Sequence, residues 1–365
     1  MRTGFAQLPL HYGSCPSWLF KRMKTLAGAI TEIIIEEFGP NELLLRLSNP
    51  YFFQAFGCVL GFDWHSSGLT TTVCGALKEA LNKKELGVFV AGGKGSVSRK
   101  TPEEIEKYSE KLNLSTTKIQ TLINASKLTA KVDNALVQDG YSLYHHIFIF
   151  TEKGKWAVIQ QGMNSTNRLA RRYHWLSDSF KEFVEEPHTA ICAQQKEKEV
   201  LDLTSKQARE AREISVDLVQ DFDLIKKFTT KQISQTSLTS PDSDFKVLNM
   251  AAQHHIKDEL KLNYETLKRA AEIQPKNYTE LIMVPGFGPK HVRALALIAN
   301  LIYGAELSWQ DPAKYSFAHG GKDGIPYPVD KELYDASIVT LQEAIKQAKL
   351  SQKEKFLALK QLQNF

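Results

Sequence analysis

The sequence predicts an α+β fold, with a mixed N-terminal domain that holds a small β element among many helices, followed by an all-α C-terminal domain. Two observations predict this fold. Apolar residues recur at helical spacing over most of the chain, and short apolar and aromatic runs typical of strands are concentrated toward its middle. The resulting order of helices, a β element and then mainly helices is typical of α+β proteins.

The clearest predicted helix covers residues 17–38. Trp18, Met23 and Ile30 are among the apolar residues at helical spacing there, and Gly39-Pro40 ends the pattern. Another helix is predicted to begin at Thr101, because a proline and two glutamates follow that threonine. The other elements predicted in this part of the chain are helices over 41–47, 50–59 and 71–84, a strand over 86–91, and a helix from Ser115.

The predicted β element is a hairpin over residues 143–161. Its strands, 143–150 and 156–161, are apolar and aromatic, and a polar loop that carries Gly154 joins them. The following segment, from Asn164 to Ser177, is predicted as another helix.

Two long amphipathic helices are predicted over 204–227 and roughly 244–274. The stretch between them, 229–244, is rich in Ser and Thr and is the best candidate for a linker. The predicted domains are therefore 1–228 and 245–365.

Composition limits the classes of protein to which the chain can belong. It has 365 residues, enough for two domains, and 42% apolar residues, which exclude wholesale disorder. A net charge of +5 permits a polyanionic partner, although a slightly basic solvated surface gives the same value. Four cysteines without a Cys-x-x-Cys pair predict free thiols in a reducing cytosol. No secretory signal is visible, and the longest apolar run, 294–303, is too short for a membrane span. These features predict a cytoplasmic or nucleoid-associated protein without a membrane partner.

Residues 279–304 carry the most specific pattern in the sequence. A short helix from about Thr279 is predicted to end at Pro285-Gly286, and the next helix to begin near Pro289. Gly286 and Gly288 allow a tight turn and a close approach of phosphate to the backbone. The first amides of the second helix have no internal partner and lie at its positive end, where they can bind an anion. Lys290, His291 and Arg293 add donors, and Phe287 or Val284 is predicted to fill the angle between the helices.

This segment resembles the helix-hairpin-helix family, whose pattern is an apolar residue, Pro-Gly-apolar-Gly and an alanine-rich helix. The resemblance implies sequence-independent binding of DNA through backbone phosphates. An ordinary pair of helices with a glycine-rich turn is the alternative. One such motif predicts weak and salt-sensitive affinity, so specificity or chemistry is expected elsewhere in the chain.

Polar residues that a core seldom contains gather in four clusters of the N-terminal part. In the first, Asp63 and His65 lie two residues apart and share one side of an extended segment, where they can ligate a divalent metal or act as a base with its orienting partner. An N-cap for the following helix is the alternative reading of Asp63.

The second cluster is the glycine-rich loop 92–100, which follows a predicted strand and precedes a helix. Its hydroxyl groups and cations suit a phosphate cradle, without the spacing of a nucleotide-binding Walker loop. A solvated basic loop is the alternative. The residues predicted to bind phosphate here are Lys94, Ser98, Arg99 and Lys100.

The third cluster lies on the hairpin and its lead-in, and it comprises Asp139, His145, His146, Gln160 and Gln161. If the turn is Thr151 to Lys155, His146 faces Gln160 across the strands, and His145 and Gln161 share the opposite face. Each polar group buried here without a partner costs about 1–3 kcal/mol. A metal, a phosphate or a substrate is the predicted partner, and a satisfied core network with Asp133, Asp139 or Tyr141 is the alternative.

The fourth cluster is arginine-rich. On the predicted helix 164–177, positions 164, 168, 171 and 172 share one face. Arginines with interleaved Tyr173 and Trp175 suit a strand of nucleic acid, and a surface salt-bridge face is the alternative. The residues concerned are Asn164, Arg168, Arg171, Arg172 and His174, and a weaker candidate loop over 319–324 adds Lys322.

Several of these segments together resemble a prokaryotic family of unknown function. The resemblance spans nearly the whole chain and implies one functional unit, without an established reaction. The segments that carry it are 1–4, 8–11, 61–68, 92–95, 98–102, 160–164 and 319–324.

The leading hypothesis is a nuclease that acts on DNA ends or single strands and hydrolyses phosphodiesters with a divalent metal, Mg²⁺ or Mn²⁺. Asp63, Asp139 and His146 are the predicted metal ligands or bases. Gln160 and Gln161 are predicted to orient water or phosphate, with Lys94, Arg171 and Arg172 as clamps. A non-catalytic DNA-binding or chromosome-organising protein is the first alternative, and an enzyme on a phosphorylated small molecule is the second. The sequence also leaves open whether the protein forms a homodimer.

Overall fold

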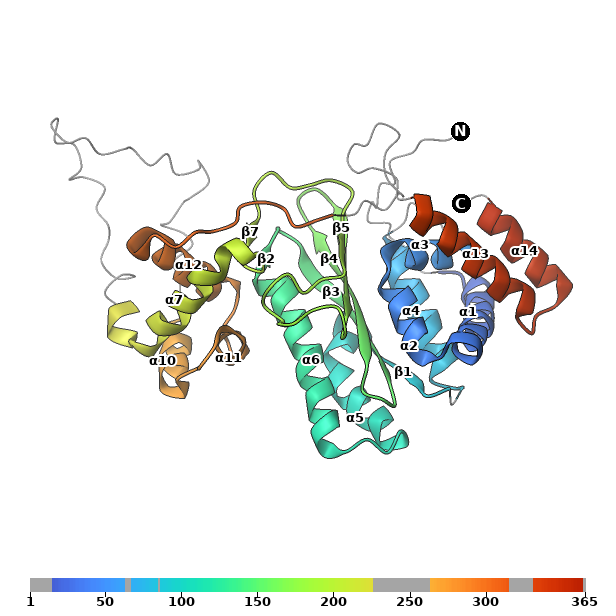
Figure 1. The fold of residues 1–365 in the computed structure, drawn as a ribbon, viewed down its shortest axis with the longest axis horizontal. Coiled ribbons are helices and arrows are strands. Elements are labelled where there is room, and N and C mark those ends of the chain that lie inside the picture. Colours follow the sequence, from blue (N-terminus) through green and yellow to red (C-terminus); the bar gives the residue numbers. More distant parts are fainter. Residues whose placement is uncertain (1–14, 63–66, 85, 226–262, 315–330, 364–365) are drawn as a thin grey trace. The chain divides into compact units, whose positions relative to one another are not determined.

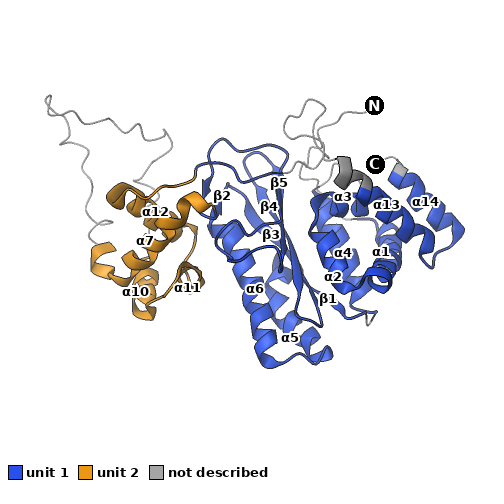
Figure 2. Ribbon diagram, in the orientation of Figure 1, with its two compact units in different colours: residues 1–204, 309–365 blue, residues 205–308 orange. Residues whose placement is uncertain are grey.

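The computed structural model describes residues 15–62, 67–84, 86–225, 263–314 and 331–363. The chain forms two compact units: unit 1 is residues 1–204 with 309–365, and unit 2 is residues 205–308 (Figure 2). The sequence assigned 245–365 to one C-terminal domain, whereas residues 309–365 group with unit 1 in the structure. The predicted linker 229–244 lies outside the described residues.

The centre of unit 1 is a five-stranded antiparallel sheet in the order β1-β3-β4-β5-β6 (Figure 1). The predicted hairpin is confirmed with its register, since His146 pairs with Gln160 and His145 with Gln161. A separate two-stranded sheet joins β2 and β7. The strands are β1 (Val88–Lys94), β2 (Val137–Gln138), β3 (Ser142–Thr151), β4 (Trp156–Asn164), β5 (Leu169–Leu176), β6 (Ala190–Cys192) and β7 (Leu201–Asp202).

The predicted helix over 164–177 is wrong, because this segment is a turn followed by strand β5. The Asn164 side-chain oxygen accepts the Thr166 amide hydrogen, and Arg168 has a φ of 59°, so the chain reverses there. The next eight residues pair along β4. Both faces of β5 are buried, so its polar and aromatic residues show no polar-apolar alternation that the sequence could have revealed. Arg171 and Arg172 therefore lie on opposite faces of the sheet.

One face of the sheet packs against helices from both ends of unit 1. Ile147, Ile149, Ala157 and Ile159 belong to the same apolar core as the helices of this layer. The first four helices agree with the sequence prediction to within a few residues. The helices of this layer are α1 (Ser17–Phe38), α2 (Pro40–Ser48), α3 (Pro50–Val59), α4 (Gly68–Leu81), α13 (Lys331–Gln347) and α14 (Gln352–Gln363).

The other face of the sheet packs against α6 (Thr116–Ala135), while α5 (Thr101–Lys111) contacts β1 and α6. A short 3₁₀ helix, η1 (Gly95–Lys100), joins β1 to α5. Aromatic rings fill this side, with Trp156 stacked on Phe148 at a centroid distance of 5.4 Å.

Unit 2 is helical in the residues described. Its α7 contacts each of the other three α-helices, and its core includes Leu281, Phe287 and Leu295. The predicted helix 204–227 is shorter than expected, and only residues 263–274 of the predicted helix 244–274 are described. The helices are η2 (Lys206–Ala208), α7 (Arg209–Gln220), α10 (Tyr264–Ile273), α11 (Tyr278–Met283) and α12 (Pro289–Tyr303).

Two further sequence predictions concern chemistry and location. All four cysteines are free thiols, as predicted. None of the described helices has both the length and the apolar character needed to cross a membrane.

Candidate functional site

The turn between α11 and α12, residues 284–288, is here called the glycine hairpin. Gly286 has a φ of 86°, and a Cβ placed on it would lie 2.9 Å from Thr266 Oγ1. Both the backbone conformation and the close contact therefore require glycine at this position. Arg269 donates to the Pro285 carbonyl at 3.1 Å and holds the tip of the turn.

The glycine hairpin is exposed at its tip and anchored from below. Pro285, Gly286 and Lys290 are exposed, whereas the side chains of Val284 and Phe287 are buried in the core of unit 2. Both predicted residues thus fill the angle between the two helices.

The start of α12 leaves the amide hydrogen of Lys290 available to a ligand. Gly288 is extended and precedes Pro289, and the first i→i−4 bond that closes here runs from the Val292 amide to the Gly288 carbonyl. The amide of Lys290 comes before that bond and lies at the positive end of the helix dipole. Together with the charge of the exposed Lys290 side chain, it gives the start of α12 a positive potential.

His291 does not take the role predicted for it. Its ring is buried, its Nδ1 accepts the Gly288 amide hydrogen at 3.3 Å, and its Nε2 lies 3.3 Å from the Asn263 carbonyl oxygen. The imidazole therefore fixes the turn instead of offering a donor to phosphate. Arg293 is half-buried.

The hairpin histidine of the third cluster, His146, belongs to a closed network on the α6 face of the sheet. Its Nε2 lies 2.9 Å from Ser126 Oγ, and its Nδ1 lies 2.8 Å from Gln160 Oε1. The Gln160 amide donates to Asp133 Oδ2 at 2.5 Å. These hydrogen bonds can run in only one direction, because the Gln160 oxygen is an acceptor. Ser126 donates to a neutral His146, and His146 donates to Gln160. Burial accordingly lowers the pKa of His146 to about 4.

Asp133 ends this network and is completely buried. It also accepts from Trp175 Nε1 at 3.1 Å and lies 2.5 Å from His188 Nε2. Burial raises the pKa of Asp133, while His188 and its hydrogen bonds oppose the rise. His146 and Gln160 are thus partners in a core network, which is the alternative that the sequence left open.

Arg171 forms a second buried cluster with two carboxylates. It donates to Asp139 Oδ2 at 3.0 Å and holds Asp311 through two bonds, at 3.0 and 2.7 Å. The Tyr173 hydroxyl donates to Asp139 at 2.7 Å, and the Tyr141 ring lies under the guanidinium. Burial raises the pKa of Asp139 to about 6, and Arg171 opposes the rise. This cluster ties the segment around Asp311 to the sheet.

Arg172 points to the opposite face and is also buried. Its Nε donates to His174 Nε2 at 2.8 Å, and its Nη1 donates to Gln54 at 3.1 Å. Gln161, on the same face, donates to the Ser67 carbonyl at 2.9 Å and to the Tyr144 hydroxyl. With at most 1% of either side chain exposed, Arg171 and Arg172 are not positioned to clamp a nucleic acid strand on the surface.

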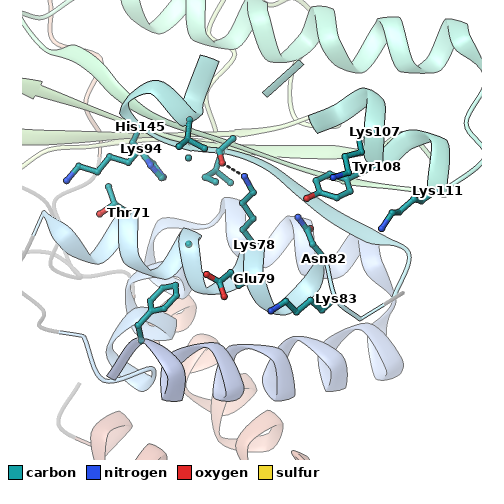
Figure 3. Close-up of a pocket in the computed structure, with 16 residues that line it drawn as sticks. Thr71, Lys78, Glu79, Asn82, Lys83, Lys94, Lys107, Tyr108, Lys111 and His145 are labelled. Atoms are coloured by element: carbon teal, nitrogen blue, oxygen red, sulfur yellow. Dashed lines mark hydrogen bonds between the residues drawn. The ribbon is translucent and has the colours of Figure 1, made fainter. Parts of the chain in front are cut away.

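Only the first residues of the predicted phosphate loop 92–100 line a cavity in the structure. Gly92, Gly93 and Lys94 line a cavity of about 680 Å³ beside β1, together with His145 and four further lysines (Figure 3). The Ser98 hydroxyl donates to the Gly95 carbonyl at 2.6 Å, so it is used within η1. Arg99 and Lys100 are exposed outside the cavity.

The predicted metal ligands do not meet in the described part of the chain. Asp139 and His146 belong to different networks, and Asp63, His65 and Lys322 lie outside the described residues. Among the described residues, no group of three or more His, Cys, Asp or Glu side chains could hold a metal ion. Asn164 and Arg168 form the β4–β5 turn and do not lie on a helical face.

Sequence reasoning found Lys94 but missed the other four lysines of the cavity and the carboxylate of Asp311. Lys107 and Lys111 are four residues apart, as are Lys78 and Asn82, so each pair shares a helical face. That spacing was visible in the sequence. The partnership of Asp311 with a residue 140 positions away was not.

Comparison with known proteins identifies a family without assigning a reaction. The profile of a family described as a protein of unknown function, DUF763, matches residues 4–329. No curated protein matches the chain, and no solved structure matches it.

Proposed function

Since the chain belongs to the DUF763 family, for which no activity is described, we propose on physical grounds that it is a DNA-binding protein that grips the sugar-phosphate backbone through unit 2. The glycine hairpin with its two helices is proposed to act as a helix-hairpin-helix. Binding of this kind is independent of sequence and places the protein on the nucleoid.

The observation that carries this proposal is the exposed, glycine-shaped turn that leads into the amide-rich start of α12. An anion at this point gains a hydrogen bond from the Lys290 amide, which precedes the first i→i−4 bond of α12, and it lies at the positive end of the dipole. Gly286 lets the phosphate approach the backbone, and Lys290 adds a charge. The buried Phe287 holds the turn in place without occupying its surface.

Hydrolysis of DNA was the leading hypothesis from the sequence, but it draws less support from the described residues. Asp139, His146 and Gln160 are buried and bonded to other side chains. None of them offers a free coordination position at a surface that DNA can reach. Non-catalytic binding is therefore the function that the geometry favours, and cleavage in the presence of Mg²⁺ or Mn²⁺ would restore the nuclease hypothesis.

The decisive variant is Gly288→Asp. A Cβ at Gly288 meets only the Gly286 carbonyl oxygen, at 3.9 Å, so the side chain fits. Aspartate is a favourable N-cap residue, so α12 should remain intact while the carboxylate occupies the first amides and repels phosphate. We expect the affinity for a fluorescein-labelled duplex, measured by anisotropy, to fall about tenfold or more, as loss of a charge-assisted hydrogen bond predicts.

Gly288→Ala is the matched control, because it adds the Cβ without the charge. It should bind DNA within about a factor of three of the parent chain, a difference of less than 1 kcal/mol. The binding constant of the parent should fall steeply with salt, in proportion to the number of phosphates contacted. Undiminished affinity of a folded Gly288→Asp protein would refute the proposal.

A further inference from the structure

A cavity in unit 1 lies beside the edge strand β1, between α4 and α5 (Figure 3). Its volume of about 680 Å³ is in the range of pockets that take small molecules. It is lined from α1, α4 and the residues that follow it, β1, η1, α5 and β3, so one compact unit supplies the whole wall. We call it the lysine pocket.

The lysine pocket carries a large excess of positive charge. Its wall includes five lysines, Lys78, Lys83, Lys94, Lys107 and Lys111, against one glutamate, Glu79.

Two of these charges are already matched, since Lys78 binds Glu104 and Glu79 binds Lys24. The other four lysines are exposed, and none takes part in an ion pair with another residue in the described segments. An anionic ligand in the hollow would give these four lysines a partner of opposite charge.

His145 gives the pocket a buried polar group with unused hydrogen-bonding capacity. Its side chain is 2% exposed, and neither ring nitrogen has a hydrogen-bond partner among the described residues. Burial, with His146 and Lys94 nearby, lowers the pKa of His145 to about 3, so the ring is neutral near pH 7. A neutral imidazole offers one donor and one acceptor. A buried donor and acceptor without hydrogen-bond partners destabilise the folded protein, and a ligand that bonds to them would remove this cost.

The edge strand β1 cannot bind a peptide as an additional β-strand, because its outward backbone groups already have hydrogen-bond partners. The outward backbone groups of Val90 are both bonded to the Asn82 side chain. Those of Gly92 are bonded to Lys78 and Glu104. Recognition in the pocket therefore depends on side chains, namely the lysines, His145 and two aromatic rings, Phe20 and Tyr108.

We propose that the lysine pocket binds a phosphorylated small molecule of nucleotide size, with its phosphates on the lysines and a polar group on His145. The Tyr108 ring in the wall is stacked on Phe89 at a centroid distance of 5.0 Å, and the ammonium groups of Lys107 and Lys111 each lie 5.9 Å from its centroid. A hollow of this volume, with a buried histidine in its wall, favours a compact ligand over a continuous strand, whose backbone must pass along an open groove. The site is separate from the glycine hairpin and does not depend on DNA binding.

The test is titration calorimetry of the full chain with ATP, inorganic phosphate and adenosine, each without added metal. We expect ATP to bind, phosphate to bind more weakly, and adenosine to bind at least about tenfold more weakly than ATP, because the cations act on phosphate charge. Adenosine equal to ATP, or no heat with ATP at millimolar concentration, overturns the proposal.

The variant Lys107→Gln/Lys111→Gln removes two exposed charges from the wall. Its matched control, Lys118→Gln/Lys127→Gln, removes two exposed charges from α6, outside the pocket. The wall variant should lose about tenfold or more in ATP affinity, and the control should lose less than about twofold. If both variants lost the same ATP affinity, the change in net charge alone would explain the loss, and the proposal would be overturned.

His145→Leu separates recognition from folding. Leucine removes a buried polar side chain that has no partner, so the melting temperature should stay level or rise while ATP affinity falls. Unchanged ATP affinity in this variant contradicts the assigned role of His145.

Two further measurements keep the two proposed sites apart. Gly288→Asp should bind ATP as the parent does, whatever its affinity for DNA. If instead a short oligo-deoxythymidine binds, its affinity falls in Lys107→Gln/Lys111→Gln, and ATP does not bind, the pocket is part of a polynucleotide surface and the small-molecule proposal fails.

Discussion

At the residue scale, His145 and His146 show how one position along a strand changes the fate of a side chain. The two histidines are adjacent on β3 and point to opposite faces. His146 is bonded on both sides, to Ser126 and Gln160, whereas His145 has no bonded partner in the described structure. The same residue type is therefore a structural element on one face and a recognition element on the other.

The pKa of His146 predicts a pH dependence of stability. The pKa of His146 in the folded protein, about 4, lies below the ordinary histidine pKa of 6.5, so the unfolded chain binds the proton more readily between these pH values. The stability that a neutral His146 contributes is complete above about pH 6.5 and is lost as the pH falls through about 4. The linkage relation gives a loss of about 2 kcal/mol between pH 7 and pH 5.

The measurement is urea unfolding of the parent and of His146→Asn at both pH values. The variant should be less stable at neutral pH, since Ser126 and Gln160 lose their partner, but its stability should change less between the two pH values. A parent and variant with the same pH dependence would show that His146 is not the titrating group.

Alternation along a hairpin allowed the sequence to predict which polar residues face each other, and the register of His146 with Gln160 is confirmed. The sheet faces on which the arginines lie could not be predicted in the same way. Both faces of β5 are buried, so Arg171 and Arg172 carry no alternating pattern, and four positions at helical spacing were misread as one helical face.

At the element scale, the edge of β1 is closed by helical side chains. Asn82 bonds Val90, and Lys78, one helical turn away on α4, bonds Gly92. Four residues of helix rise about 6 Å, close to the rise of two residues of strand, so the two spacings match. At every second residue of β1, a side chain thus makes the hydrogen bonds that a neighbouring strand would otherwise make.

Removal of this closure is predicted to expose the edge. Asn82→Ala leaves the amide and carbonyl of Val90 without their partner, which should destabilise unit 1 by about 1–3 kcal/mol. It should also promote association between copies of the chain through the freed strand. Asn82→Asp, which retains the acceptor, should lie between the parent and the alanine variant in both respects.

The measurements are urea unfolding and sedimentation velocity at several protein concentrations. An Asn82→Ala protein as stable as the parent, with an unchanged sedimentation coefficient, would show that the Asn82 bonds contribute nothing to the edge.

Long elements were predictable from their periodicity, and short ones were not. The helix at 17–38 and the strands of the hairpin agree with the structure. The strands β2, β6 and β7 have two or three residues each, too few to display a period, and their pairing is decided by distant contacts.

At the scale of the whole molecule, α13 and α14 complete the core of unit 1. Leu341, Ile345 and Leu362 belong to the same apolar cluster as α1, α3 and α4. The sequence placed these residues in the all-α second domain by their position along the chain. That position cannot show that their apolar side chains pack against α1, α3 and α4.

Leu341→Ala/Ile345→Ala is predicted to destabilise unit 1. Each substitution removes a buried branched side chain, at a typical cost of about 2–5 kcal/mol. The five tryptophans all lie outside residues 205–308, so tryptophan fluorescence during urea unfolding reports unit 1 alone.

Lys346→Gln, at an exposed position of the same helix, is the control and should leave the urea midpoint unchanged. A midpoint unaffected by the double alanine variant would contradict the assignment of α13 to this core.

The division of unit 1 also orders events during synthesis. Unit 2 is one continuous segment, so the ribosome releases it whole before Asp311 can bond to Arg171, 140 positions earlier. Translation commonly lets the earliest segment fold first. Here the apolar surface that α1, α3 and α4 present to α13 and α14 stays uncovered until residues 331–363 emerge. Chaperone engagement on nascent chains should therefore persist beyond release of the inserted helical segment and end only after α13 and α14 have emerged.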